Sequence, residues 1–351
     1  MNTLTDLAGW KALEKTYDKR GLVIALGAGV SVGCGLPNWE ELLKKLAFKC
    51  FGDRGGSLFE DLKADGYNLP AIAGIIRAQD PDRFPADVRE ALYSHDEFKE
   101  YYPNGVTKSN RRSFISFIHR CNPTLRAIAA MCAKKKQGKE TYTINPRIHA
   151  LINFNVDALL QAYTYARYEK RLIRTVERPS AGSRPGKISM YHMHGFLRFD
   201  DKSDDLTKDA PDALVFSEQE YFDVFNEPTS LFNYTFLYLL REHSCLFIGL
   251  SLKDDNIRRL LHYSRMEREA AYEKELGKAP SARKIIRHFA ILPKPNTSQL
   301  KNIVQKSLSM LGTRPIWIFD FKTEIPRGIG NLYSRGGLQW DTVYERHQRG
   351  I

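Results

Sequence analysis

An apolar run, Leu22–Leu26, leads directly into the glycine-rich sequence Gly27–Ser31, and a second turn-like segment, Gly35–Trp39, follows. A short continuous apolar run that ends at glycine is typical of a strand buried on both faces of a parallel sheet. The next segment, Glu40–Phe48, has leucines at helical spacing. Glycine lets the backbone approach a phosphate closely, and a helix start favours an anion. The sequence therefore predicts a strand, loop and helix that bind a dinucleotide.

The glycine loop departs from the G-x-G-x-x-G pattern of dehydrogenases, because Ser31, Val32 and Gly33 stand where that pattern continues. Taken alone, its Gly-Ala-Gly sequence also fits an ordinary tight turn in an α/β sheet. The choice between a phosphate site and a simple turn therefore depends on the rest of the chain.

Strand-like runs alternate with helical patterns after residue 141. These predicted strands are Ala150–Ile152, Ile188–His194, Cys245–Leu250, His288–Leu292 and Ile316–Phe319. Such alternation predicts the α/β class, with a doubly wound, parallel, Rossmann-like sheet. Residues 47–140 show helical spacing and few strand-like runs, so we interpret them as a mainly helical insertion. The core then comprises residues 1–46 and 141–326, and residues 327–351 form a C-terminal tail.

Composition excludes several classes of protein. Hydrophobic residues make up 42% of the 351 residues, which is enough for a sizeable core and argues against a disordered chain. No run approaches the roughly 20 apolar residues that span a bilayer, and the first residues lack the basic cluster of a secretory signal. The five cysteines form no Cys-x-x-Cys pair, which fits a reducing compartment. We therefore expect a cytoplasmic protein that does not contact a membrane.

The formal net charge of +12 permits binding to nucleic acid without favouring it. The basic residues are spread along the chain, and the densest groups are Lys134–Lys136 and Arg265–Arg287. The second group also holds several glutamates, so it reads as a solvated helix with salt bridges.

Polar residues follow three of the predicted strands, and each has an ordinary structural interpretation. Asn155 and Asp157 precede a predicted helix, where either residue is a common cap. His194 ends a predicted strand, where histidine is a general base in some enzymes and a structural residue in more. His192 lies two residues earlier, but no third metal ligand is suggested by the spacing, so we expect no metal. Gly249–Asp254 again fits a turn followed by a helix cap.

The glycine loop and the polar segments after the predicted strands are more informative when they are taken together in chain order. The Gly27–Ser31 loop with Gly35-Leu36-Pro37, then Asn155-Val156-Asp157, then His194-Gly195, then Gly249-Leu250-Ser251, resembles the sirtuin fold family in order and spacing. The resemblance covers nearly all of residues 20–320. It implies a Rossmann-like fold that binds NAD+.

Two departures separate the chain from the protein-deacylating sirtuins. Those enzymes carry a zinc module with two Cys-x-x-Cys pairs after the catalytic histidine, whereas this chain has only Cys245 there. Pro37-Asn38-Trp39-Glu40, the Gly249–Asp254 turn and the Phe216–Tyr221 segment look instead like a bacterial sirtuin-like branch. That branch supplies effectors of anti-phage systems, which deplete NAD+ in an abortive infection. The resemblance therefore implies an NAD+ hydrolase that needs no metal.

The resemblance also implies roles for particular residues. Asn155 would position the water or a ribose hydroxyl, His194 would accept a proton, and Asp157 would orient the Asn155 turn or contact the nicotinamide ribose. The pyrophosphate would be held by Gly27, Ala28, Gly29 and Ser31. The adenine-side ribose or phosphate would be met by Ser251 and Asp254. The resemblance also implies that NAD+ is bound by Pro37, Trp39 and Gly249.

Two other functions stay open at this point. A protein deacylase or ADP-ribosyltransferase would use the same residues but would need a groove for its target. A non-catalytic sensor of NAD+ or ADP-ribose would keep the pocket only for binding. For the hydrolase we expect a homo-oligomer, gated by a partner protein of the same defence system such as a HerA-type ATPase or a nucleic-acid-guided sensor, because free NAD+ hydrolysis would be toxic.

Overall fold

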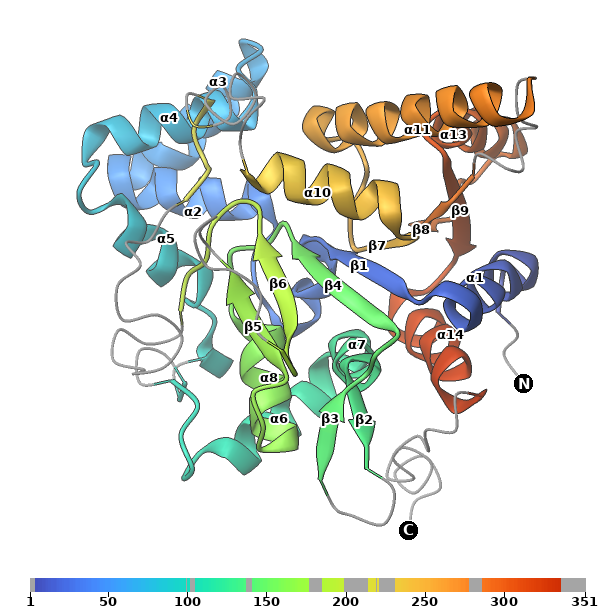
Figure 1. Ribbon diagram of the computed structural model, residues 1–351. Coiled ribbons are helices and arrows are strands. Elements are labelled where there is room, and N and C mark those ends of the chain that lie inside the picture. The colour runs from blue at the N-terminus through green and yellow to red at the C-terminus, as the bar shows by residue number, and fades with distance from the viewer. Residues whose placement is uncertain are drawn as a thin grey trace.

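The central element of the molecule is the first strand, β1, which lies in the middle of a seven-stranded parallel sheet (Figure 1). The computed structural model describes residues 4–98, 100–101, 105–136, 141–176, 185–198, 214–218, 220, 231–277 and 286–335. The strand order is β5-β6-β4-β1-β7-β8-β9. The strands are β1 Leu22–Leu26, β4 Ile148–Asn153, β5 Ile173–Val176, β6 Ile188–His192, β7 Cys245–Ile248, β8 His288–Pro293 and β9 Thr313–Ile318. This arrangement confirms the predicted α/β, Rossmann-like fold.

Alternate residues of β1 enter two separate cores because successive side chains of a strand point to opposite faces. Leu22, Ile24 and Leu26 join the larger core, and Val23 and Ala25 join the smaller one. All five residues are buried, which explains why the strand reads as a continuous apolar run.

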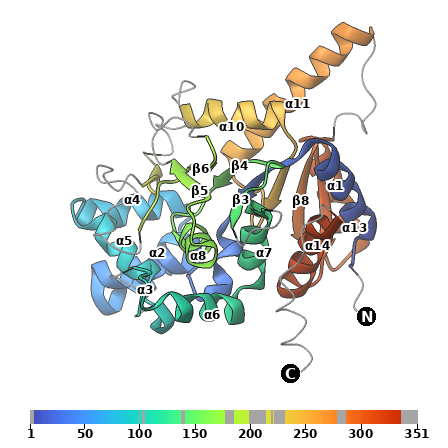
Figure 2. The same ribbon diagram turned by 60° about the horizontal axis from the view of Figure 1, so that its bottom comes forward.

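Helices cover both faces of the sheet (Figures 1 and 2). α10, α11 and α13 supply side chains to the smaller core, and most other helices supply the larger one. The larger core is built from α1 Leu7–Arg20, α2 Trp39–Phe51, α3 Gly55–Ala64, α4 Leu69–Gln79, α5 Phe84–Leu92, α6 Arg111–Cys121, α7 Pro123–Cys132, α8 Leu159–Tyr168 and α14 Phe321–Arg335. The helices of the smaller core are α10 Leu231–Glu242, α11 Asp255–Leu276 and α13 Ser298–Ser309.

Residues 47–140 hold α3 to α7 and the short strand β2 Ala133–Lys135, which pairs with β3 Tyr142–Ile144 in a separate hairpin. The buried side chains of these helices belong to the larger core of the sheet. α7 also packs against α14. The region thus shares one hydrophobic core with the sheet.

Several expected boundaries differ from the structure, and β4 and β9 each begin earlier than predicted, at Ile148 and Thr313. β6 ends at His192 and β7 at Ile248, two residues before the predicted ends, because each chain turns at a glycine of positive φ, Gly195 and Gly249. The C-terminal tail expected from residue 327 begins inside α14, whose Ile329 and Leu332 are buried in the larger core. The rest of that tail, residues 336–351, lies outside the described residues.

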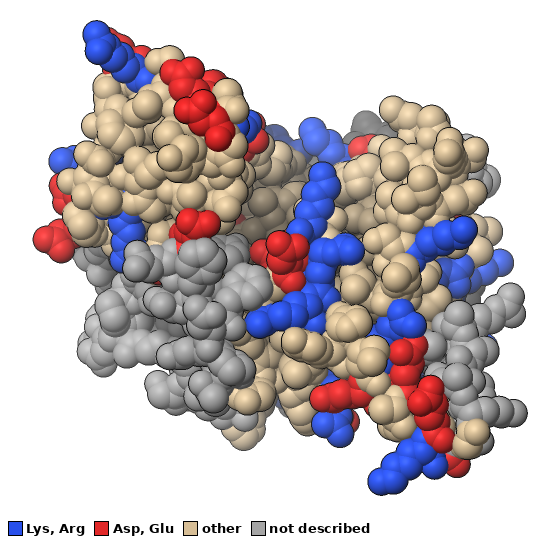
Figure 3. Space-filling model, turned by 90° about the horizontal axis from the view of Figure 1, so that it is seen from above, with Lys and Arg blue, Asp and Glu red and all other residues tan. Residues whose placement is uncertain are grey.

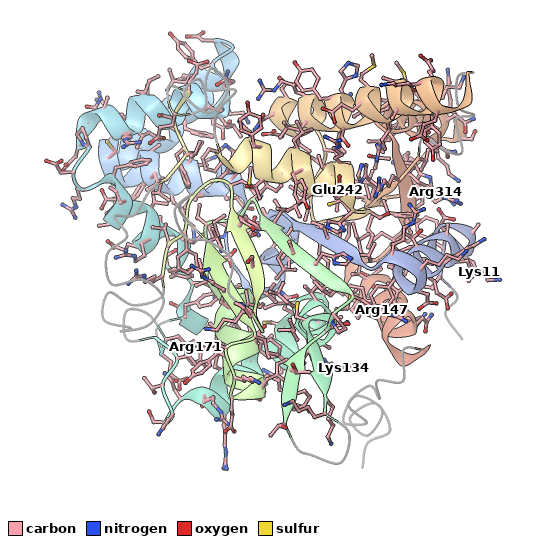
Figure 4. All side chains as sticks on the ribbon, in the orientation of Figure 1. Lys11, Lys134, Arg147, Arg171, Glu242 and Arg314 are labelled. Atoms are coloured by element: carbon pink, nitrogen blue, oxygen red, sulfur yellow. The ribbon has the colours of Figure 1, made fainter. Side chains whose placement is uncertain are left out.

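Basic side chains are distributed over many elements. Lys11 lies on α1, Lys134 on β2, Arg147 before β4, Arg171 after α8 and Arg314 on β9 (Figure 4). On the face seen from above, lysines and arginines form small groups with acidic side chains nearby (Figure 3). Within the described part of the chain, no helix is both long and apolar enough to cross a membrane.

Candidate functional site

The register of the sheet brings four loops to one place. Leu26 at the end of β1 is the partner of Asn153 in β4 and of Ile248 in β7, and Asn153 is in turn the partner of His192 in β6. The loops that follow these residues therefore leave the sheet side by side, at its carboxyl edge. The chain order also reverses about β1, and this is where α/β sheets bind their ligands.

A pocket of about 200 Å³ opens at this edge. It is lined by Gly27, Ala28, Ser31, Leu36, Pro37, Trp39, Leu42, Leu92, Phe154, Asn155, Val156, Asp157, His194, Phe216 and Leu250. Eight of the twelve residues to which the resemblance gives a catalytic or binding role are among them, namely Gly27, Ala28, Ser31, Pro37, Trp39, Asn155, Asp157 and His194. Gly29, Gly249, Ser251 and Asp254 do not line the pocket.

The glycine loop is built as two short 3₁₀ turns, η1 Ala28–Val30 and η2 Val32–Cys34, and α2 starts only at Trp39. The amides of Gly29, Val30 and Ser31 donate to carbonyls of the protein, so these three positions do not offer the free N–H groups of the helix start that we expected. The Gly29 amide donates to the carbonyl of Gly249. A Cβ atom on Gly27 would lie 2.5 Å from that same carbonyl oxygen. Gly249 therefore packs closely against the glycine loop and accepts a hydrogen bond from it.

Ser31 joins the two polar residues that follow β4. Its hydroxyl donates to Asp157 Oδ2 at 2.7 Å and accepts from Asn155 Nδ2 at 3.3 Å. The other carboxylate oxygen of Asp157 accepts from the Leu159 amide at 3.0 Å. Burial raises the pKa of Asp157, and the bonds from Ser31 and Leu159 oppose that rise. The network fixes the side chain of Asn155 at the pocket wall.

His194 lies in the turn after β6. Its ring meets Phe154 edge to face, with centroids 5.5 Å apart. Burial lowers the pKa of His194, while the charge of Asp254 and a hydrogen bond to the Phe154 backbone raise it. The lowered pKa keeps the imidazole neutral at pH 7, which is the form that accepts a proton.

His192 has a role that the sequence did not reveal. Its Nδ1 lies 3.1 Å from the Asn155 carbonyl oxygen, and its Nε2 lies 2.7 Å from Gln161 Nε2. Because a carbonyl only accepts, Nδ1 carries the proton and Nε2 accepts from Gln161. Burial lowers the pKa of His192 to about 4, so the ring is neutral. His192 thus holds the backbone of Asn155, and both of its ring nitrogens are occupied by protein groups.

Ser251 and Asp254, the two residues expected on the adenine side of NAD+, do not line the pocket. Ser251 is exposed. The carboxylate of Asp254 accepts from the Ile257 amide at 2.9 Å and caps α11, which is the ordinary role considered for it in the sequence. Asp254 affects the site electrostatically, because its negative charge raises the pKa of His194.

Phe216 and Trp39 form an aromatic wall of the pocket. Their ring centroids are 4.4 Å apart, and Phe216 is also in edge contact with Phe84 at 6.1 Å. One oxygen of Glu220 accepts from the amides of Phe216 and Ser217, both at 2.8 Å. The other oxygen of Glu220 pairs with Arg77 of α4. Tyr221, from the same sequence motif, lies outside the described residues.

Among the described residues, no three histidine, cysteine, aspartate or glutamate side chains are grouped closely enough to hold a metal ion. The polar groups that line the pocket are hydroxyl, amide, carboxylate and imidazole groups, and its walls are apolar and aromatic. These groups fit a ligand with ribose hydroxyls and a flat ring, which is the composition of the nicotinamide riboside half of NAD+.

Residues 149–316 match the family model described as the SIR2-like domain. The match supports a sirtuin-like family and NAD-dependent chemistry for this chain. It spans β4 to β9 and so includes Asn155, Asp157 and His194, whereas the Gly27–Ser31 loop precedes it. A comparison with curated proteins found no match.

Proposed function

We propose that this protein hydrolyses NAD+ to nicotinamide and ADP-ribose. The observation that carries the proposal is the single pocket in which Asn155, His194 and the Ser31–Asp157 pair meet at the carboxyl edge of the sheet. The SIR2-like match supports NAD+ as the substrate. The residues that would hold NAD+ are the glycine loop, Pro37 and Trp39 together with this polar group.

In the proposed reaction, the bond between ribose C1′ and the nicotinamide nitrogen breaks and the oxygen of water bonds to C1′. Such cleavage passes through an oxocarbenium-like transition state. Nicotinamide leaves without protonation because it is already cationic in NAD+. The neutral imidazole of His194 accepts the proton of the water or of a ribose hydroxyl. Asn155, fixed by Ser31, positions that water or hydroxyl.

The proposal is tested by incubating the purified chain with NAD+, alone and together with the proteins of its neighbouring genes, and measuring nicotinamide and ADP-ribose. Asn155→Ala and His194→Ala should each reduce turnover by about 100- to 10,000-fold. His262→Ala, an exposed histidine of α11, is the matched control and should keep wild-type turnover. A His194→Ala variant that binds NAD+ and turns it over normally would overturn the assignment. Nicotinamide release that requires an acylated peptide would instead indicate a deacylase.

We further propose that the hydrolase is an anti-phage effector that is gated by assembly with a partner. Support comes from the zinc-less sequence pattern and from the toxicity of unrestrained NAD+ loss. Expression with and without the neighbouring genes, followed by measurement of cellular NAD+ during phage infection, tests the gate. NAD+ that stays constant in infected cells would contradict the defence role.

A further inference from the structure

A buried tyrosine from residues 47–140 reaches beneath the pocket. Tyr93 directly follows α5 and is 2% exposed. Its hydroxyl donates to the carbonyl oxygen of Leu197 at 3.1 Å and accepts from the amide of Ala158 at 3.0 Å. Tyr93 itself does not line the pocket, whereas its neighbour Leu92 does.

The two partners of Tyr93 lie on the two loops that carry the candidate catalytic residues. Ala158 directly follows Asp157, and Leu197 comes shortly after His194. The Leu197 amide also donates to the carbonyl of Val156 at 2.6 Å. These three hydrogen bonds link the loop after β4 to the loop after β6. The Leu197 amide bonds to the first loop directly, and the Leu197 carbonyl bonds to it through the Tyr93 hydroxyl.

Only a side chain that both donates and accepts can complete this link, because one partner is an amide and the other a carbonyl. A tyrosine hydroxyl has both capacities and stands at the end of a rigid ring. The ring is itself packed against Phe98, with centroids 5.8 Å apart. Loss of the hydroxyl alone leaves a buried amide and a buried carbonyl unpaired, which is unfavourable.

We infer that Tyr93 is a positioning residue that fixes the distance between the His194 loop and the Asn155–Asp157 loop. The inference rests on the proposed NAD+ hydrolysis, in which groups of both loops act on the same ribose. Through Tyr93, the region of residues 47–140 would affect turnover by positioning the two loops, without lining the pocket itself at this residue.

The test compares Tyr93→Phe with Tyr163→Phe. Tyr163 is a suitable control because it is 1% exposed and its hydroxyl lies 2.8 Å from His119 Nε2, outside the pocket. Both variants lose the hydroxyl of a buried tyrosine, and Tyr93→Phe should lose more stability because its hydroxyl makes two buried bonds where that of Tyr163 makes one to His119. Only Tyr93→Phe should lose kcat, by about 10- to 100-fold, since misplacement of reacting groups is that costly. Its KM and its affinity for ADP-ribose should stay near wild type.

Amide hydrogen exchange provides a second readout that needs no turnover. Tyr93→Phe should speed exchange in peptides that cover residues 155–159 and 194–198, and Tyr163→Phe should not. Equal kcat in the two variants would overturn the inference, and so would unchanged exchange in both loops of Tyr93→Phe. If the wild-type chain releases no nicotinamide either alone or together with the proteins of its neighbouring genes, the proposed function fails, and the exchange measurement still decides the role of Tyr93.

Discussion

Replacement of Ser31 by alanine tests whether the hydrogen bond from the Ser31 hydroxyl to the buried Asp157 carboxylate stabilises the folded protein. Ser31 is 4% exposed and Asp157 is 5% exposed, so water cannot replace the 2.7 Å hydrogen bond between them. A hydrogen bond to a charged group contributes about 1.5–3 kcal/mol. We expect Ser31→Ala to lose about that much free energy of unfolding at pH 7.5.

The size of the thermal shift follows from the length of the chain. Unfolding entropy of about 2.1 cal/mol/K per residue gives about 0.7 kcal/mol/K for 351 residues. The expected loss in Tm is therefore about 2–4 °C. Differential scanning calorimetry and urea unfolding measure the two quantities. Ser57→Ala is the control, because its hydroxyl makes a 2.9 Å bond to the Arg54 carbonyl in an exposed position.

The pH dependence of this loss has a definite sign. The Ser31 hydroxyl lowers the pKa of Asp157, so it stabilises the folded state when the carboxylate is charged. Its contribution is present at high pH and disappears as the pH falls through the pKa of Asp157. A loss no larger than that of Ser57→Ala, or a loss that does not change with pH, would refute the reasoning.

Asp254→Asn keeps the cap of α11 but removes a charge that raises the pKa of His194, so the acid limb of the pH–rate profile should move to lower pH. His192 has a pKa of about 4 in the folded state and about 6.5 in the unfolded state. The free energy of unfolding, measured in urea, should therefore decrease as the pH is lowered from 6.5 to 4. Elemental analysis should find no stoichiometric zinc, and one zinc per chain would reopen the deacylase interpretation. Light scattering at micromolar concentration should show a homo-oligomer, for which the exposed Tyr234 and Tyr238 of α10 are candidate contacts, and a fully active monomer would contradict the gate.

The sequence was sufficient to predict the sheet and to predict that the strand-end segments lie together at one of its edges. β1 is recognisable because it is buried on both faces and ends at glycine. The strand-end clusters could be grouped because parallel strands present their carboxyl ends at one edge. β5 was missed because Arg174 interrupts a run of only four residues. α1 was also missed, although Trp10, Leu13 and Tyr17 are buried at helical spacing.

The supporting contacts of the site could not be predicted in the same way. Tyr93 bonds to Ala158, which is 65 residues away, and His192 contacts Gln161 across 31 residues. No local pattern reports such pairs, because they arise from packing between separate elements. At Asp254 the structure shows the helix cap that the sequence pattern also allowed, and the ligand contact implied by the resemblance stays a prediction.

The central position of β1 decides how this protein can be divided. The segment that matches the SIR2-like domain begins after β1, yet β4 and β7 each pair with β1 and not with one another. A fragment of residues 149–316 would therefore present two bare strand edges where the intact chain has none. Exposed edges of apolar strands invite pairing with other chains and aggregation. Any shortened version meant for crystallisation must keep residues 22–26, because they join the two halves of the sheet.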